Sequence, residues 1–426
     1  MIYDELLKDD VIPRIAKVSY NIEHGHIDDV CAEIDKQLAA AHVLQRIKKG
    51  NTVALTGSSR SITDLDLILK RLAERIHEIG GKPFIIPAMG SHGGATAEGQ
   101  MKILEEYGIT EEKMGFPVLS SMETVQIGTS ESGLPVCIDR YAYEADCIVV
   151  VGRIKPHTDF HGKVESGLMK MMAIGLGKQH GASICHKRGF KKMPRNVLEF
   201  GRTVLKNANV IFGVGIVEDF FHNTYMLEVI PSEKIEEREA ELLILAKRLI
   251  PCIPFEKIDV LAVQEIGKDI SGSGMDPNVT GRSGQMGISR PYAETIAVFD
   301  ITDKSCHNGA GIGLADVTTQ RAFEKIRFEM TYPNGITACD IHGMKIPPVM
   351  PNDRLALKHA LHLVTESDWQ KGIRMVWIKN TCAMEQFYIS EALLEEAEHT
   401  DGVEILTGVS EMQFDEYGNA VADWEL

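Results

Sequence analysis

Two kinds of apolar spacing alternate along the first 250 residues. The stretches at 64 to 80 and 97 to 109 carry apolar side chains three and four positions apart and reach a glycine at or near their ends, as amphipathic helices do. They separate short apolar runs of strand length, at residues 53 to 57, 83 to 90, 147 to 154 and 210 to 219. This alternation predicts parallel strands joined by crossover helices.

A second series follows a break that contains prolines. The helical pattern at 233 to 249 stops before Pro251 and Pro254, which predicts a domain boundary. Strands are then expected at 260 to 267, 295 to 302 and 375 to 380, and helices near 315 to 329, 352 to 365 and 389 to 399. We therefore predict an α/β protein with an N-terminal parallel-sheet, Rossmann-like domain (1–251) and a smaller C-terminal α/β domain (252–426). The active site is expected in the cleft between them.

The charge and composition of the chain narrow the choice of partners. Its 426 residues are 44% hydrophobic and 25% charged, which is enough to bury a large core. The net charge of -16, without any Lys/Arg-rich run, argues against nucleic acid. The eight cysteines form no CxxC pair, the first residues hold no apolar leader region, and no apolar run approaches roughly 18 residues. We therefore expect a full-length cytoplasmic protein that does not enter a membrane.

Unusual motifs stand directly after three of the predicted strands. They are SSRSIT (58 to 63), SHGGAT (91 to 96) and KPHTDFHG (155 to 162). In open α/β sheets, ligands bind beyond the carboxyl ends of the strands. If the three strands are neighbours, the three loops line one crevice.

The first two loops carry candidate binding and catalytic residues. Arg60 is expected where the next helix starts, a place that disfavours a cation unless an anion also binds there. Arg60 is thus a candidate for holding a carboxylate or a phosphate, and Ser58 and Ser59 either cap the helix or contact the same anion. His92 lies in a glycine-rich loop that lets a ligand approach, so it is a candidate acid or base. The alternatives are a solvated arginine and a structural histidine.

Residues 153 to 186 contain the highest density of potentially reactive side chains, because four of the fifteen histidines of the chain lie there, on either side of Lys170. Imidazole can bind a metal or move a proton near neutral pH, and a neighbouring lysine can be a nucleophile or a covalent anchor. His157 and His161 are four residues apart, but the flanking proline and glycine favour a loop, and the HExxH pattern of zinc proteases is missing. Lys170, in a methionine-rich helical stretch, could instead be a structural lysine.

Together these motifs resemble the nickel-dependent lactate racemase family, whose members carry a nickel-pincer nucleotide on a lysine and racemise or epimerise 2-hydroxy acids. The resemblance extends from the SSRSIT loop to roughly residue 350. Its most specific part is the spacing of sixteen residues between Lys170 and His186. The site residues that it implies are the substrate-binding Arg60, the catalytic His92 and His157, the cofactor-binding Lys170, Ser58, Ser166 and Gly167, and the nickel ligand His186.

Three features depart from the family's pattern. Gly57 stands where the best-known members have an aspartate. The spacing from His157 to Lys170 is three residues longer than expected, which makes His161 an alternative second base. The loop GKDISGSGMDPN (267 to 278) lacks the family's usual Tyr-Gln and later Lys, which leaves room for a longer hydroxy acid or a sugar acid.

The implied reaction explains the residue types. The hydrogen on C2 is a poor acid beside a carboxylate, so its loss as hydride, while a histidine takes the hydroxyl proton, avoids a dianionic enolate. The 2-keto acid can then turn over, and a second histidine serves its other face. The implied partners are a small 2-hydroxy acid and the enzymes that make the cofactor. Two other classes stay open: a zinc- or iron-dependent hydrolase or lyase that uses the same histidines, and a non-catalytic protein that binds a metabolite or the cofactor.

Overall fold

The structure is a computed structural model that describes residues 2–21, 24–59, 62–187, 189–284, 287–288, 291–338, 341–368 and 370–424. The chain forms two compact units, residues 23–250 and residues 1–22 together with 251–426. Each unit contains a sheet with parallel strands and the helices that connect them. The predicted two-domain α/β fold class is therefore confirmed.

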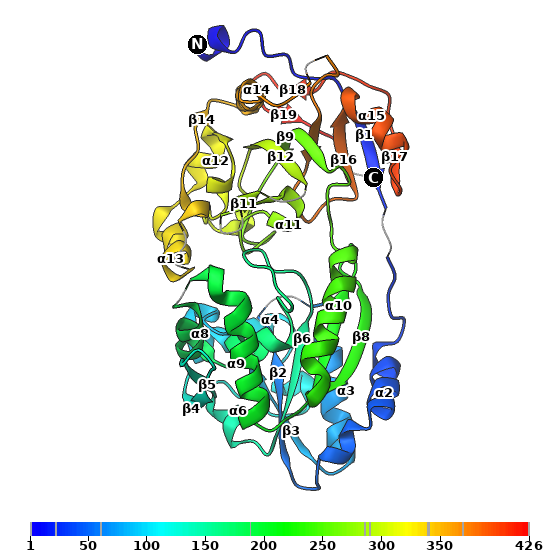
Figure 1. The fold of residues 1–426 in the computed structure, drawn as a ribbon, viewed down its shortest axis with the longest axis vertical. Helices are drawn as coiled ribbons and strands as arrows, with labels where there is room; N and C mark the ends of the chain where they lie inside the picture. Colours follow the sequence, from blue (N-terminus) through cyan, green and yellow to red (C-terminus); the bar gives the residue numbers. More distant parts are fainter. Residues whose placement is uncertain are drawn as a thin grey trace. The chain divides into compact units, whose positions relative to one another are not determined.

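The N-terminal unit is built on a five-stranded sheet with the strand order β3-β2-β6-β7-β8 (Figure 1). The first four strands of this order are parallel, and the last is antiparallel to its neighbour. The bounds are β2 (Thr52–Gly57), β3 (Lys82–Pro87), β6 (Cys147–Arg153), β7 (Val210–Glu218) and β8 (Thr224–Pro231). The four parallel strands are those that the apolar runs predict.

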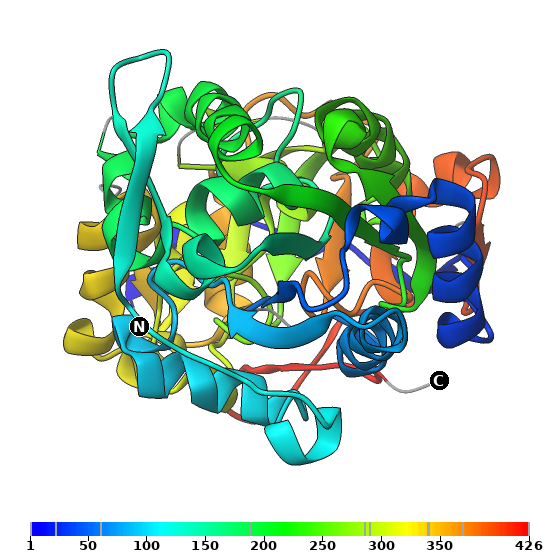
Figure 2. The ribbon, with the colours of Figure 1, turned by 90° about the horizontal axis from the view of Figure 1, so that it is seen from below.

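Helices cover both faces of this sheet, as Figure 2 shows. Successive strand residues point to opposite faces, so Val149 and Val151 of β6 face one set of helices, and Ile148 and Val150 face the other. The first set is α2 (Val30–Ala41), α3 (Leu65–Glu78) and α4 (Ala97–Glu106). The second is α7 (Leu168–Lys170), α9 (Met193–Asn207) and α10 (Ile235–Leu249).

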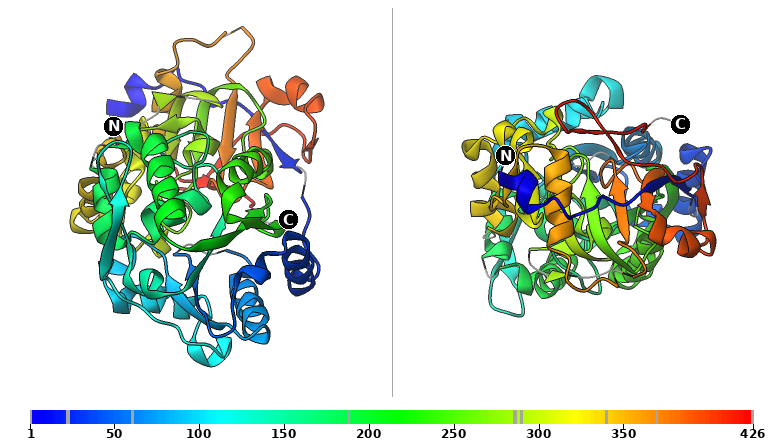
Figure 3. Two further views of the ribbon diagram at one scale, coloured as in Figure 1. Left: turned by 60° about the horizontal axis from the view of Figure 1, so that its bottom comes forward. Right: turned by 90° about the horizontal axis from the view of Figure 1, so that it is seen from above.

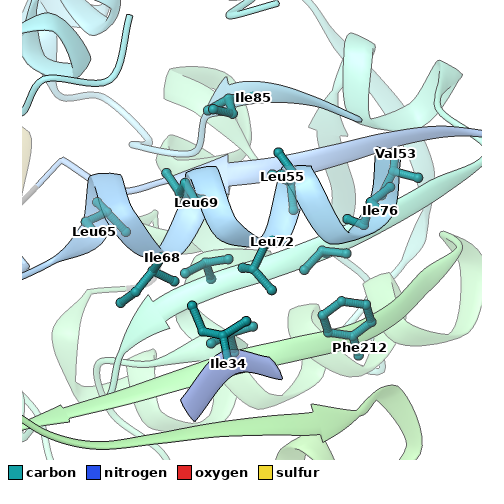
Figure 4. Close-up of a cluster of buried hydrophobic side chains, with 14 of the residues drawn as sticks. Ile34, Val53, Leu55, Leu65, Ile68, Leu69, Leu72, Ile76, Ile85 and Phe212 are labelled. Carbon is teal, nitrogen blue, oxygen red and sulfur yellow. The ribbon is translucent and has the colours of Figure 1, made fainter. Parts of the chain in front are cut away.

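The apolar stripe of α3 illustrates why the helical pattern was readable from the sequence. Leu65, Ile68, Leu69, Leu72 and Ile76 recur at three- and four-residue spacing, and all are buried against the sheet (Figure 4). Fully burying one such side chain contributes about 1.5–3 kcal/mol. In contrast, the hairpin of β4 (Thr124–Thr129) and β5 (Pro135–Asp139) was not predicted, because β4 buries none of its side chains fully and so carries no apolar run.

The C-terminal unit contains an eight-stranded mixed sheet in the order β14-β13-β12-β9-β15-β16-β1-β17. Its first five strands are parallel, and the other three pair antiparallel. The bounds are β1 (Ile15–Tyr20), β9 (Lys257–Val263), β12 (Tyr292–Val298), β13 (Val317–Thr319), β14 (Val349–Met350), β15 (Met375–Ile378), β16 (Gln386–Ser390) and β17 (Val403–Ile405).

Several elements of this unit differ from the sequence-based expectation. The stretch near 315 to 329 begins with β13 and continues as two helices, α12 (Gln320–Lys325) and α13 (Phe328–Ala338). The stretch near 389 to 399 begins inside β16 and only then becomes the short helix α15 (Leu394–Glu398). Both contain β-branched or aromatic residues that fit a strand as well as a helix, so pattern alone could not divide them. The helix α14 (Asp353–His362) lies where it was expected.

The first residues of the chain belong to the C-terminal unit rather than to the N-terminal domain in which the sequence placed them. The strand β1 inserts between β16 and β17 and pairs antiparallel with both. In Figures 1 and 3 it is the blue strand beside the orange β16. Nothing local reveals this pairing, because the two partners lie more than 360 residues further along the chain.

In the part of the chain that the structure describes, no helix combines the length and apolarity that crossing a bilayer requires.

Candidate functional site

The carboxyl ends of β2, β3 and β6 lie side by side at one edge of the N-terminal sheet. β2 pairs in parallel with both of the other strands. The three strands end at Gly57, Pro87 and Arg153, and the loops with the unusual motifs follow at once. The three loops therefore leave the same edge of the same sheet.

His92 contacts the loop that follows β2. Its Nδ1 lies 2.5 Å from the hydroxyl oxygen of Ser59, and the Tyr107 hydroxyl donates to the Ser59 carbonyl at 3.1 Å. His92 itself is exposed. A serine hydroxyl can donate or accept, so the neutral imidazole can carry its hydrogen on either nitrogen. That freedom suits a group that must both take and give a proton.

Of the other two predicted residues of the first loop, Ser58 and Arg60, the structure describes only Ser58. Ser58 is buried directly after β2. Arg60 lies outside the described residues. The helix α3 begins at Leu65.

Phe160 connects the histidine loop to Lys170. The ring of His157 stacks on the buried ring of Phe160, with centroids 4.1 Å apart and an interplanar angle of 25°. The Nζ of Lys170 lies over the same ring at 5.9 Å from its centroid. A cation over an aromatic face is attracted by about 0.5–1 kcal/mol or more. Two of the predicted site residues thus share one aromatic neighbour.

His186 ends the helix α8 (Lys178–His186), and its own helix fixes the imidazole. Its Nδ1 lies 2.7 Å from the carbonyl oxygen of Ala182. A carbonyl only accepts, so Nδ1 donates its hydrogen and Nε2 keeps a lone pair. Burial lowers the pKa of His186, the hydrogen bond to Ala182 opposes this, and the nearby charge of Lys170 lowers it further. The imidazole is thus held neutral, in the form that binds metals.

Glu165 organises the loop between β6 and Lys170. Its buried carboxylate accepts hydrogen bonds from the backbone of His157 at 2.8 Å, the backbone of Gly162 at 3.3 Å and the Lys247 ammonium at 2.7 Å. It also lies 3.1 Å from Nδ1 of His161. Burial alone would raise the pKa of Glu165, but the bonds from His161, Lys247 and the His157 backbone outweigh it and hold the pKa below its ordinary value. The loop therefore folds around a carboxylate that remains charged.

The two histidines of this loop, His157 and His161, differ in the group that contacts Nδ1 of the ring. The backbone N–H of Asp159 donates to Nδ1 of His157 at 2.9 Å, so the neutral ring carries its hydrogen on Nε2. His161 faces the Glu165 carboxylate, so its hydrogen lies on Nδ1 and its Nε2 can accept. The His157 side chain is 11% exposed and that of His161 is 43% exposed. Of the two, His157 is the one that shares Phe160 with Lys170.

The residues before Lys170 are held by backbone pairing and by a buried acid. Ser166 exchanges two backbone hydrogen bonds with Lys155, at 2.9 and 3.2 Å. Gly167 approaches Glu239 of α10 so closely that a Cβ would lie 2.3 Å from Oε1. Glu239 is fully buried and accepts the N–H of Met169 at 2.7 Å, and burial raises its pKa to about 8. The close approach to Glu239 accounts for the glycine by packing.

Glu165 and Glu239 were not predicted as site residues from the sequence. A usable signal existed for Glu239, because it stands four residues after Ile235 and three before Leu242 on the buried stripe of α10. A charged residue at such a position must find a buried partner. For Glu165 the spacing gives no comparable signal, since its partners come from its own irregular loop and from α10.

In the loops of the C-terminal unit, polar side chains form hydrogen bonds that stabilise turns and cap helices. The Lys268 ammonium donates to the Gly272 carbonyl within the 267–278 loop, and Asp276 caps the short helix α11 (Pro277–Thr280). Asp316 pairs with Arg282, and the Thr318 hydroxyl donates to a backbone carbonyl at 2.9 Å. Across the residues with a described structure, no three His, Cys, Asp or Glu side chains gather as a metal site.

The fold and the site define a class: an α/β protein that gathers histidines and a lysine at the carboxyl edge of a parallel sheet. Residues 6–197 match the lactate racemase N-terminal domain, and this match spans all the predicted site residues from Ser58 to His186. Over residues 6–197, the chain is therefore similar to the lactate racemase family.

Solved structures that match part of the chain include the lactate racemase apoprotein from Thermoanaerobacterium thermosaccharolyticum. It is 16% identical over 67% of this chain and 74% of that chain, with a TM-score of 0.44. A protein from Thermotoga maritima is 14% identical over 65% of this chain and 72% of its own, with a TM-score of 0.46. No sequence among curated proteins matches the chain. The similarity to the lactate racemase family rests on the domain match.

Proposed function

We propose that the protein is a racemase or epimerase that inverts C2 of a 2-hydroxy acid with a nickel-pincer nucleotide joined covalently to Lys170. The cofactor is pyridinium-3-thioamide-5-thiocarboxylic acid mononucleotide nickel. The observation that carries the proposal is the state of His186: the Ala182 carbonyl fixes the hydrogen on Nδ1 and leaves a lone pair on Nε2. Burial lowers the pKa of the ring, and Lys170 lies near enough for its charge to lower it further.

The residues present fit such a group. A cofactor that brings its own carbon and sulfur donors needs one covalent anchor and one further borderline ligand, and Lys170 and His186 supply these two. The Ala182 carbonyl orients the His186 ring, which is the supporting interaction that metal-binding histidines usually have. Ser58, Ser166 and Gly167 would line the cofactor. When bound, the cofactor would supply an acceptor for the hydride from C2 of the substrate.

The chain's own residues would do the binding and the proton transfer. Arg60 would hold the substrate carboxylate, because a guanidinium matches its two oxygens. His92, whose Ser59 partner permits either tautomer, would take the hydroxyl proton on one face. His157 would serve the other face: once protonated from solvent at Nδ1, which accepts the Asp159 N–H in the neutral ring, its imidazolium would give the Nε2 proton to the 2-keto acid oxygen and return to a neutral ring. Asp159, with Oδ2 at 3.8 Å from Nδ1 of His157, would stabilise that protonated ring.

Intact-protein mass spectrometry tests the proposal. The chain is produced together with the cofactor-making enzymes, which are its proposed partners. We expect one adduct of nucleotide size per chain, about one nickel per chain, and inversion of at least one acid from a panel of C2-chiral hydroxy acids. Lys170→Ala should lose adduct, nickel and activity together. The control Lys163→Ala, which changes an exposed lysine paired with Glu236, should keep all three.

Two results would overturn the proposal. An unmodified chain that contains stoichiometric zinc or iron would favour the hydrolase or lyase class. A chain that carries the adduct but inverts no acid in the panel would favour a protein that binds the cofactor without catalysis.

A further inference from the structure

Lys178 is a fully buried lysine at the start of α8, and none of the roles above uses it. Its Nζ lies 2.9 Å from the Asp139 carboxylate, and both side chains are 0% exposed. The same Nζ donates to the Pro87 carbonyl at 2.5 Å and to Oε1 of Gln100 at 3.1 Å. Burying an ion pair costs several kcal/mol per ion in desolvation, so such a pair is weak evidence for stability and better evidence for a fixed geometry.

The partners of Lys178 connect it to the loop that carries His92. Pro87 ends β3, and the loop starts at the next residue. Gln100, which is also buried, donates from Nε2 to the carbonyl of Gly90 at 2.9 Å and to the carbonyl of His92 at 3.3 Å. An ammonium group can only donate, so it forces Oε1 of Gln100 toward itself and thereby points Nε2 at the loop.

The same lysine lies in the segment that joins the two proposed cofactor residues. Backbone hydrogen bonds connect Gly90 to Gly175 at 3.2 Å and Asp139 to Leu176 at 2.7 Å. The contact is backbone to backbone, because a Cβ on Gly175 would lie 2.6 Å from the Ala88 carbonyl oxygen. Lys178 therefore lies where the His92 loop meets the chain that runs from Lys170 to His186.

The backbone of Lys178 gives an independent sign of constraint. Its φ is +51°, in the left-handed region that residues other than glycine rarely adopt. Such a conformation persists only where surrounding contacts over-determine it, and it is concentrated at functional sites.

We propose that Lys178, Asp139 and Gln100, here called the Lys178 network, are positioning residues that set His92 against the Lys170–His186 segment. Lys178 anchors the end of β3, Gln100 holds two carbonyls of the loop, and Asp139 keeps the ammonium in place. All three side chains of the network are buried, and their effect on catalysis rests on the proposed function. Their effect on the His92 loop does not depend on the proposed function.

The variant Gln100→Met tests the network, because it removes the link to the loop and leaves the Lys178–Asp139 pair. We expect amide hydrogen exchange in residues 88–96 to accelerate by about tenfold or more, with little change elsewhere in the N-terminal unit. In the cofactor-loaded enzyme we expect kcat to fall about tenfold to a hundredfold at nearly constant KM, since a displacement of 1 Å has that size of effect. The adduct on Lys170 should be retained. The control Gln179→Met, at an exposed neighbour of Lys178, should change neither readout.

A second variant separates positioning from stability. Lys178→Met/Asp139→Asn removes both buried charges and keeps a side chain able to cap α6 (Arg140–Glu144) as Asp139 does. We expect it to keep a near-normal thermal midpoint and still to show fast exchange in residues 88–96 with a lowered kcat.

Unchanged exchange in residues 88–96 of Gln100→Met would refute the network's role, and so would an increase spread evenly over the N-terminal unit. Local exchange that changes as expected in a chain that inverts no substrate would uphold the network and refute the proposed function instead.

Discussion

The group at Nδ1 fixes the position of the hydrogen on His157 and on His186, but not on His92. Ser59 permits either tautomer of His92, the Asp159 N–H places the hydrogen of His157 on Nε2, and the Ala182 carbonyl leaves Nε2 of His186 free of hydrogen. The open tautomer of His92 suits exchange of a proton, and the lone pair on Nε2 of His186 suits metal binding, whereas His157 must be protonated at Nδ1 before it can donate from Nε2. Residue type alone could not separate them.

The choice between His157 and His161 can be tested at this scale. We expect His157→Gln to lower kcat by about 10²- to 10⁴-fold in the loaded enzyme, the usual contribution of a general acid or base. His161→Gln should lower it by less than about tenfold, because His161 contacts Glu165 rather than the neighbourhood of Lys170. Steady-state kinetics of both variants, each with its Lys170 adduct verified by mass, give the measurement. The reverse order would assign the second proton-transfer role to His161.

The sequence could reveal the residues of the site whose neighbours along the chain are distinctive. His92 stands among glycines, and Lys170 and His186 stand at a characteristic spacing. The partners of Lys178 could not be predicted, because Asp139, Gln100 and Pro87 come from three separate elements. Only the pairing of strands and the packing of helices brings them together.

Among the elements, the short helix that carries Lys170 depends on α10. Glu239 accepts the N–H of Met169 in the first turn of α7, and after Lys170 the chain makes one π-helical turn, in which the Leu176 N–H donates to Met171 at 2.8 Å. The apolar pattern predicted a helix here but not its division into α7, the π-helical turn and α8. That division is set by tertiary contacts, which override local propensity.

The raised pKa of Glu239 implies that the stability of the N-terminal unit depends on pH. Its pKa is raised from 4.5 to about 8 in the folded chain, so between these values the folded state holds one proton more than the unfolded state. The free energy of unfolding should therefore fall as pH rises through this window, by up to about 1.4 kcal/mol per pH unit from this group. The Glu239→Gln variant lacks this contribution, so its free energy of unfolding should fall less steeply as pH rises.

The measurement is urea unfolding of the N-terminal unit between pH 5 and 8, followed by hydrogen exchange in peptides from α10 and β7. Glu237→Gln, at an exposed position of the same helix, should parallel the unchanged chain. Parallel curves for Glu239→Gln as well would show that Glu239 does not carry the extra proton.

For the whole molecule, the apolar runs were sufficient to predict two α/β units, and they failed at the first strand. β1 is nearly all buried, and its side chains pack in the core of a unit whose remaining residues begin at 251. Its partners were invisible because pairing across such a separation leaves no local trace in the pattern.

Removal of residues 1–22 tests this assembly. The deletion takes a strand from between β16 and β17, and burial of Ile15 and Val18 alone contributes about 1.5–3 kcal/mol each. We expect the C-terminal unit to lose at least about 3 kcal/mol of stability, while the N-terminal unit keeps its own transition. Tryptophan fluorescence follows the C-terminal unit, because all three tryptophans lie beyond residue 251. Deletion of residues 1–6 alone, which leaves β1 intact, is the control, and an equal loss in both deletions would contradict the assignment.

The position of β1 also sets an order of events during synthesis. The first 22 residues leave the ribosome early, but the partners at 386–390 and 403–405 follow more than 360 residues later. At about 5–20 residues per second, this strand waits roughly 20–70 s for its neighbours, while the 23–250 unit has time to fold as an insertion. During that interval its apolar side chains and open hydrogen-bonding edges are accessible to other nascent chains. Slower, cooler expression with chaperones present should therefore raise the yield of correctly folded protein.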